Sequence, residues 1–196
     1  RRRRCYRKMA APGIAGTEAA EAVSTSGAVL AGDLGGTRLR AAVVGPSGEV
    51  RSKQVVPTPA DDPSAVARTL RSVLNTSGEA VVATVVGVPG PVDYSRGEVL
   101  RLPNLPAWEG GIGAARLSSA LGLEVLLAND ADLAALGEHR FGAGRGSRDM
   151  VYVTSSTGVG AGVLLNGRLV HGRLSLAEIG HTIIDRTTYE TVEQLG

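Results

Sequence analysis

Two turns rich in glycine and threonine have the composition of phosphate-binding loops. The first, DLGGT at residues 33–37, and the second, TGVG at 157–160, each lie between segments with the composition of β-strands. Glycine lets backbone N–H groups approach phosphate oxygens closely, and a threonine hydroxyl donates a further hydrogen bond. The first turn is neither a Walker P-loop, because no G-x-x-x-x-G-K-[ST] occurs, nor a Rossmann fingerprint, because a strand follows the glycines. The alternative is a tight hairpin that needs glycine only for its shape.

Asp33 and Asp130 are the two carboxylates best suited to chemistry. The Asp33 carboxylate offers a hard oxygen ligand for Mg²⁺ or for a water of its hydration shell. Asn129-Asp130 follows the apolar segment 124–128 and precedes a helical pattern. A carboxylate at the C-terminal end of a strand projects into the cleft of an α/β unit, where it can accept the proton of an attacking hydroxyl. Taken alone, Asp130 is better explained as the N-cap of the following helix.

Glu178 and His181 form a second polar pair, three residues apart and flanked by apolar side chains. A ligand with several hydroxyl groups needs acceptors and mixed donor–acceptor groups close together, and a carboxylate with an imidazole supplies both. A structural role for His181 is an equally good explanation when the residue is taken alone. A metal-ligand role has little support, because no cysteine or second histidine lies nearby.

Hydrophobic patterning predicts the elements that position these residues. Apolar or β-branched runs predict strands at 28–33, 38–44, 49–56, 80–88 and 124–128. The run at 80–88 is suited to a central strand covered on both faces. Helices are predicted from the start signal Asp62-Pro63 and over 114–121 and 131–140. The order β-β-β-α-β-α-β-α defines a first domain at 28–141.

The opening pattern returns after the glycine-rich linker 142–147. A strand at 150–155 leads into a Gly/Thr turn at 157–162, a strand at 161–165, an Asn-Gly turn and a strand beginning at 168–171. This repeated plan predicts two similar lobes facing each other across a cleft, with the two turns holding a triphosphate from both sides. The second copy, at 148–196, stops where its first helix is expected to start, so the second lobe is expected to be partial.

The overall composition narrows the classes of function. The chain of 196 residues is 43% hydrophobic and 20% charged, as in a globular protein, and no apolar stretch is long enough to cross a membrane. Of 21 basic residues, six lie among the first eight, so the remaining 15 are outnumbered by 19 acidic residues, which argues against a nucleic-acid-binding surface.

Cys5 is the one cysteine, so a reducing cytoplasm is expected. Residues 1–27 lack apolar mass and are expected to be a disordered tail.

Taken together, the motifs resemble those of the ROK family of sugar kinases and regulators. The segments 33–37, 87–91, 102–108, 129–130, 157–162 and 178–181 occur in the order and kind found in that family. The similarity runs from about Leu30 to the end of the chain. It implies the α/β fold of the actin-like, ribonuclease-H-like ATPases, with a first lobe that is nearly complete and a second that is partial.

The resemblance also implies a reaction and a set of site residues. The reaction is ATP- and Mg²⁺-dependent phosphorylation of a hexose, expected to be glucose, at its 6-hydroxyl, with Asp130 as general base. The residues it implies for phosphate binding are Asp33, Gly35, Gly36, Thr37, Thr157, Gly158 and Gly160, and Asp33 is expected to contact Mg²⁺ through a water molecule. The residues it implies for binding sugar hydroxyls are Asn104, Asn129, Glu178, His181 and Glu193. The full-length form is expected to be a cytoplasmic homodimer that binds neither membranes nor nucleic acid.

The sequence departs from the family pattern around His181 and at its C-terminal end. Many members continue with a cysteine-rich loop that holds zinc together with the histidine, whereas residues 183–190 contain no cysteine, so no zinc is expected. Glu193 falls where a second sugar-binding glutamate follows that loop, which indicates a shortened loop. Ala177, just before Glu178, stands where many members of the family have glycine. The family's C-terminal adenine-binding segment is missing, so the 196-residue chain alone is expected to bind ATP poorly.

Three alternatives stay open at this level. Sugar-responsive regulators of the family carry a helix-turn-helix domain ahead of the first turn, and residues 1–27 are too short and too rich in glycine and alanine for one. A non-catalytic actin-like scaffold would not need Asp130 together with Glu178 and His181. An N-acetylhexosamine kinase is the third, because the sequence does not separate glucose from mannose, fructose or their N-acetylated relatives. Nor does it separate ATP from polyphosphate as the phosphate donor.

Overall fold

The computed structural model of the protein describes residues 27–102, 104–155, 158–172, 174 and 177–195, with only the backbone at 193 and 195. The chain forms two compact units, which divide between Asp130 and Ala131. The boundary that the sequence predicts between two lobes, at residues 141–148, stays a prediction. Apart from Gly27, the predicted tail lies outside the described residues. In the part of the chain that is described, no helix is both long and apolar enough to span a membrane.

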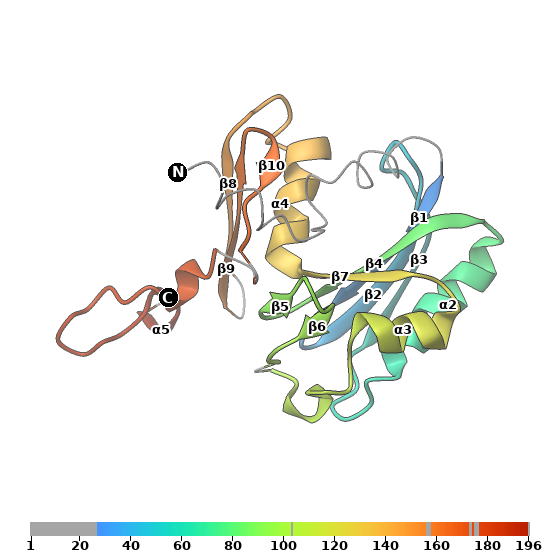
Figure 1. Ribbon diagram of the computed structural model, residues 1–196, viewed down its shortest axis with the longest axis horizontal. Helices are drawn as coiled ribbons and strands as arrows, with labels where there is room; N and C mark the ends of the chain where they lie inside the picture. The colour runs from blue at the N-terminus through green and yellow to red at the C-terminus, as the bar shows by residue number, and fades with distance from the viewer. Residues whose placement is uncertain (1–26, 103, 156–157, 173, 175–176, 196) are drawn as a thin grey trace, which may run out of the picture. The chain divides into compact units, whose positions relative to one another are not determined.

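A five-stranded mixed sheet forms the centre of the first unit (Figure 1). Its strands are β1 (Ala28–Leu34), β2 (Arg38–Val44), β3 (Val50–Pro57), β4 (Val81–Val88) and β7 (Val125–Asn129). The strand order is β3-β2-β1-β4-β7, with β1, β4 and β7 parallel and the β1–β2 and β2–β3 pairs antiparallel. The carboxyl ends of the three parallel strands therefore meet at one edge of the sheet.

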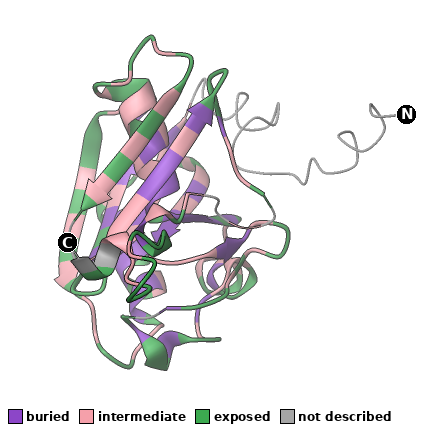
Figure 2. Ribbon diagram, turned by 90° about the vertical axis from the view of Figure 1, so that its left-hand side faces the viewer, coloured by how far each residue is buried: buried purple, intermediate pink, exposed green. Residues whose placement is uncertain are grey.

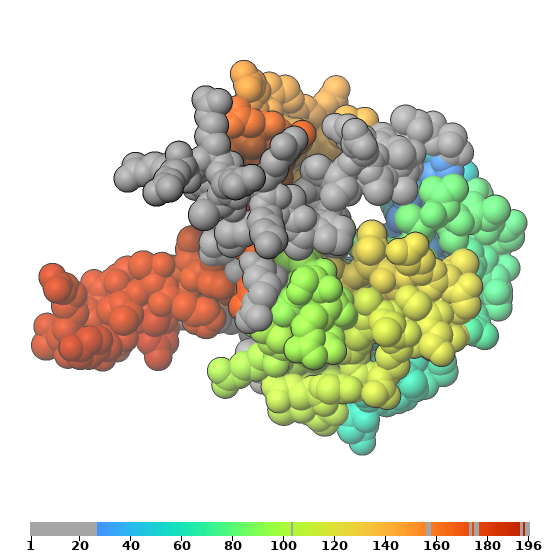
Figure 3. Space-filling view, in the orientation of Figure 1, coloured from blue at the N-terminus to red at the C-terminus, as the bar shows by residue number. Residues whose placement is uncertain are grey.

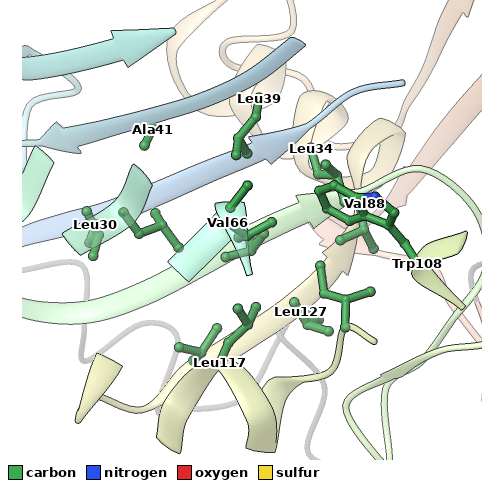
Figure 4. Close-up of a cluster of buried hydrophobic side chains, with 14 of the residues drawn as sticks. Leu30, Leu34, Leu39, Ala41, Val66, Val88, Trp108, Leu117 and Leu127 are labelled. Atoms are coloured by element: carbon green, nitrogen blue, oxygen red, sulfur yellow. The ribbon is translucent and has the colours of Figure 1, made fainter. Parts of the chain in front are cut away.

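The core lies between this sheet and two helices that contact each other, α2 (Ala65–Ser77) and α3 (Ala114–Leu121). Alternate residues of β1 are buried, which gives the strand one core face, and the buried positions are purple in Figure 2. In α2, Val66, Leu70 and Val73 are buried, as their helical spacing predicts. Figure 4 shows side chains of the strands and helices meeting in this cluster.

Two small elements connect β4 to α3 and were not predicted. A two-stranded hairpin is made of β5 (Val92–Asp93) and β6 (Glu98–Val99), and a 3-10 turn, η2 (Pro106–Trp108), follows. Trp108 is fully buried, and its indole N–H donates a hydrogen bond to the Pro59 carbonyl at 3.0 Å. These short elements escaped prediction because their pairing partners and their burial are set by the surrounding fold rather than by local periodicity.

The second unit contains a three-stranded antiparallel sheet of order β10-β9-β8. Its elements are α4 (Asp130–Phe141), β8 (Met150–Ser155), β9 (Val159–Leu165), β10 (Arg168–Leu169), η3 (Ile179–His181) and α5 (Val192–Leu195). Helix α4 lies close against β9, because a Cβ added at Gly162 would come within 2.5 Å of the Ala135 Cβ. Asn166 and Gly167 both have positive φ, which suits the predicted two-residue turn between β9 and β10.

Most predicted elements are confirmed to within two residues, and three expectations need correction. The predicted turn at 157–162 is shorter, because β9 already starts at Val159 and pairs with β8. The strand predicted at 168–171 is confined to Arg168–Leu169. The run at 80–88 is not covered on both faces throughout: Val82 is 54% exposed, whereas Val86 and Val88 are buried.

Candidate functional site

The turn between β1 and β2 is closed by hydrogen bonds that leave its tip exposed. The Gly35 N–H donates to the Arg38 carbonyl at 3.0 Å, and Gly36 and Thr37 are exposed. Thr58, just after β3, fastens the turn twice: its N–H donates to the Thr37 carbonyl at 3.0 Å and its hydroxyl to the Gly35 carbonyl at 2.7 Å. Thr58 carries no sequence signal of this role, because the role depends on β3 lying beside β2.

Asn104 lies directly beside this turn. A Cβ added at Gly36 would lie 3.3 Å from the Cβ of Asn104, so the glycine leaves room for the asparagine to approach. Asn104 is exposed. The structure therefore brings one residue predicted to bind sugar next to one predicted to bind phosphate.

The sheet register brings the remaining candidates of the first unit to the same edge. Asp33 pairs with Gly87, and Gly87 pairs with Ala128, so the three residues form one row across β1, β4 and β7. Adjacent strands are about 4.8 Å apart, which places Ala128 about 10 Å from Asp33. Asn129 and Asp130 continue beyond this row. The 33–37 turn and the Asn-Asp pair thus share the carboxyl edge of the parallel strands.

Asp33 is engaged in an ion pair that the sequence did not reveal. Arg40 lies opposite Asp33 in the antiparallel β1–β2 pair, and its Nη1 lies 2.6 Å from Asp33 Oδ2. The two side chains are 46% and 47% exposed, and ion pairs of such exposure contribute only about 0–1 kcal/mol. A carboxylate held this weakly still fits the hard-oxygen chemistry of Mg²⁺ or of a Mg²⁺-bound water.

Asn129 anchors the end of β7. Its side-chain amide donates to the Gly90 carbonyl at 3.1 Å, and its backbone N–H donates to the Tyr94 hydroxyl at 3.3 Å. The residue is only 7% exposed. Asp130 follows as the exposed first residue of α4. Its position suits a helix-capping role and a catalytic role alike, so both predictions stand at this point.

The second turn is only partly described. Thr157 lies outside the described residues, and Gly158 lies in a bend just before β9. Gly160 lies inside β9 rather than in a turn, and a Cβ there would come within 3.2 Å of the Ala131 Cβ. Close packing against α4 is thus one reason for glycine at this position. Phosphate binding by the three residues stays a prediction.

Glu178 and His181 lie together on a short 3-10 turn. Their Oε2 and Nε2 atoms are 3.9 Å apart, and the two side chains are 42% and 71% exposed. The backbone N–H of His181 donates to the backbone carbonyl of Glu178 at 3.1 Å, which holds the two residues on one turn. The structure therefore presents a carboxylate and an imidazole side by side, as the sequence predicts for a ligand with several hydroxyls.

An extended arm at residues 182–191, red in Figures 1 and 3, follows this turn. Backbone hydrogen bonds from Ile184 to Glu190 and from Val192 to Thr182 make it a hairpin. The Asp185 carboxylate accepts the N–H groups of Thr187 and Thr188 at 2.7 and 3.0 Å, and these bonds lower the Asp185 pKa below its usual value of 3.8.

The expectation that no zinc binds near this arm stays a prediction. Within the described ranges, no group of three His, Cys, Asp or Glu side chains could hold a metal ion. A backbone hydrogen bond from Val192 to Thr182 joins the start of α5 to the residue after His181. Glu193 lies in α5, and its side chain is outside the described part of the structure.

Asp185→Ala is expected to loosen the arm. The two backbone N–H groups lose their acceptor, so the hairpin opens more often and limited proteolysis within the arm becomes several-fold faster. Since the folded-state pKa is depressed, the stabilisation is present above pH 3.8 and is lost as the pH falls through the lowered pKa. Asp61→Ala, at an exposed aspartate outside the arm, is the control. Equal cleavage rates in both variants would argue against the role of Asp185.

Thr58→Val is expected to weaken nucleotide binding in the full-length natural polypeptide that contains these residues, called the full-length protein below. Loss of the hydroxyl bond to Gly35, worth about 1 kcal/mol, should raise the KM for ATP about fivefold. Thr76→Val removes a similar bond, from Thr76 to the Ser72 carbonyl at 2.8 Å in α2, and is the control. An unchanged KM for ATP in Thr58→Val would show that the turn does not bind the nucleotide.

Comparison with known proteins identifies the family of the chain. The family model described as "ROK family" matches residues 29–192. Streptomyces coelicolor glucokinase is 34% identical over 79% of this chain and 49% of its own length. Citrobacter koseri N-acetylmannosamine kinase is 36% identical over 80% of this chain and 54% of its own length.

A solved structure is similar over the same region. The ROK family glucokinase from Streptomyces griseus, determined in complex with glucose and AMPPNP, is 34% identical with a TM-score of 0.73, over 81% of this chain and 51% of that one. The predicted α/β fold of the actin-like kind is thereby confirmed. The chain spans about half the length of the curated relatives it matches. By sequence and by fold, it belongs to the ROK family.

Proposed function

We propose that the chain is part of an ATP-dependent hexose kinase whose substrate is glucose. The observation that carries the proposal is the register of β1, β4 and β7, which places the 33–37 turn and Asn129-Asp130 at one edge of the sheet. A phosphoryl-transfer site needs this combination, namely backbone donors for phosphate oxygens beside a carboxylate that handles the attacking hydroxyl. The 34% identity to a glucokinase over most of the chain supports the choice of sugar.

The roles of the residues follow from their chemistry. The exposed backbone at Gly36 and Thr37 would donate hydrogen bonds to phosphate oxygens. Asp33, on releasing Arg40, would hold a water of the Mg²⁺ shell, and the metal would offset negative charge on the transferring phosphate. Asp130 would orient the sugar hydroxyl and accept its proton.

The sugar-binding roles also stay proposals. Asn104, Glu178 and His181 would bind sugar hydroxyls, with Asn129 and Glu193 as further candidates. Thr157, Gly158 and Gly160 stay proposed phosphate contacts. ATP and Mg²⁺ are the proposed cofactors, and a cytoplasmic homodimer is the proposed form of the full-length protein.

An N-acetylmannosamine kinase is the second candidate, because a relative of that activity is 36% identical over a similar share of the chain. The decisive experiment gives the full-length protein glucose, mannose, fructose, N-acetylglucosamine and N-acetylmannosamine, each with ATP or polyphosphate. Glucose 6-phosphate formed with ATP at the highest kcat/KM is the expected result. Preference for N-acetylmannosamine would select the alternative, and sugar-dependent DNA binding without turnover would select a regulator.

A further inference from the structure

The end of β7 is held from outside the sheet by a tyrosine. β7 is an outer strand of the five-stranded sheet, with a partner strand, β4, on one side. Backbone groups on the open side of such a strand need other hydrogen-bond partners. At Asn129 this partner is Tyr94, whose hydroxyl accepts the backbone N–H at 3.3 Å. Asn129 is the residue immediately before Asp130.

Tyr94 itself belongs to a well-fixed hairpin. Asp93, 2% exposed, accepts hydrogen bonds on its carboxylate from the N–H and hydroxyl of Ser95 at 3.1 and 2.6 Å. The Asp93 carbonyl accepts the Gly97 N–H at 2.8 Å, and the Gly97 carbonyl accepts the Ala114 N–H at 2.8 Å. These bonds connect the hairpin to the start of α3. The ring of Tyr94 also packs against the core cluster, so the hydroxyl is presented from a fixed place.

The same segment holds the side chain of Asn129. Gly90, four residues before Tyr94, accepts the Asn129 amide at 3.1 Å, and the next residue, Pro91, accepts the Leu100 N–H at 3.0 Å. Main chain and side chain at Asn129 are thus both fixed by residues 90–94. The backbone at Asn129 sets the position of Asp130, the next residue. A displacement of a catalytic group by about 1 Å can cost about a hundredfold in rate.

We propose that Tyr94 is a positioning residue for Asp130: its hydroxyl fixes the strand end from which the carboxylate projects. The inference rests on the proposed function, in which Asp130 is the base. It predicts that the hydroxyl affects the chemical step more than sugar binding, because the Asn129 side chain, itself a candidate sugar ligand, keeps its own hydrogen bond to Gly90. Stability should change little, because the ring keeps its packing and a single hydrogen bond contributes only about 1 kcal/mol.

The test is Tyr94→Phe in the full-length protein, with Tyr152→Phe as a matched control. Tyr152, in β8, is also partly buried, and within the described residues its hydroxyl makes no hydrogen bond. Tyr94→Phe is expected to lower kcat about tenfold, with the KM and calorimetric Kd for glucose and the Tm close to wild type. Tyr152→Phe is expected to leave all four quantities unchanged.

Three outcomes overturn the proposal, and they separate it from the proposed function. Equal kcat in Tyr94→Phe and Tyr152→Phe, with Asp130→Asn inactive, refutes the role of Tyr94 alone. A loss of activity in Tyr94→Phe that tracks a fall in Tm or a rise in KM shows a merely structural role. Normal turnover in Asp130→Asn removes the proposed base, and with it the group that Tyr94 would position. In the inactive Asp130→Asn background, Tyr94→Phe should have no further effect on kcat.

Discussion

Asp130→Asn is expected to lower the kcat of the full-length protein by at least about a hundredfold, the scale of general-base catalysis, with the KM for sugar little changed. The amide keeps the shape of the carboxylate but cannot accept the proton of the sugar hydroxyl. The substitution also separates the two explanations of Asp130, because asparagine caps a helix about as well as aspartate. A residue that only caps α4 would therefore leave both stability and turnover unchanged.

Kinetics with saturating ATP and varied glucose, together with a thermal melt, measure this effect. Asp61→Asn makes the same chemical change at an exposed aspartate in the loop before α2 and should behave as wild type. Near-normal turnover in Asp130→Asn, with an unchanged Tm, would identify Asp130 as a cap and leave the reaction without its proposed base.

Trp108→Ala is expected to destabilise the first unit by about 3–5 kcal/mol, a large share of the about 5–15 kcal/mol that typically stabilises a domain. The side chain is fully buried in the core cluster, where Figure 4 shows it with Leu34 and Val88. The substitution leaves a cavity and removes the indole hydrogen bond to Pro59. The turn that carries Asn104 is connected to η2, so sugar binding should weaken as well.

Hydrogen exchange of peptides from β1 and β4, followed by mass spectrometry, measures this loss without needing tryptophan fluorescence. Phe141→Ala is the control, because Phe141 is 55% exposed and its truncation should change stability by no more than about 0.5 kcal/mol. The loss of stability in Trp108→Phe should lie between those of Trp108→Ala and Phe141→Ala. Unchanged hydrogen-exchange protection of β1 and β4 in Trp108→Ala would contradict the packing of the Trp108 side chain in the core.

The elements and the family of this protein were predictable from local sequence patterns. Strands and helices were predictable because their side chains repeat with periods of 2 and 3.6, and these periods depend on neighbouring residues alone. The bounds of β2, α3 and β8 agree with prediction to the residue. The family was recognisable because its motifs are short runs such as 33–37 and 178–181, each complete within a few consecutive positions.

The contacts that hold the candidate residues became visible in the assembled fold. The bonds from Thr58 to the 33–37 turn, from Arg40 to Asp33 and from Asn129 to Tyr94 join different strands or loops. Each contact depends on strand order and register, which no local pattern specifies. The packing of Gly160 against Ala131 likewise appears only once α4 lies on β9. The residues proposed to do chemistry were therefore visible in the sequence, whereas the side chains that contact them became identifiable only when the sheet was assembled.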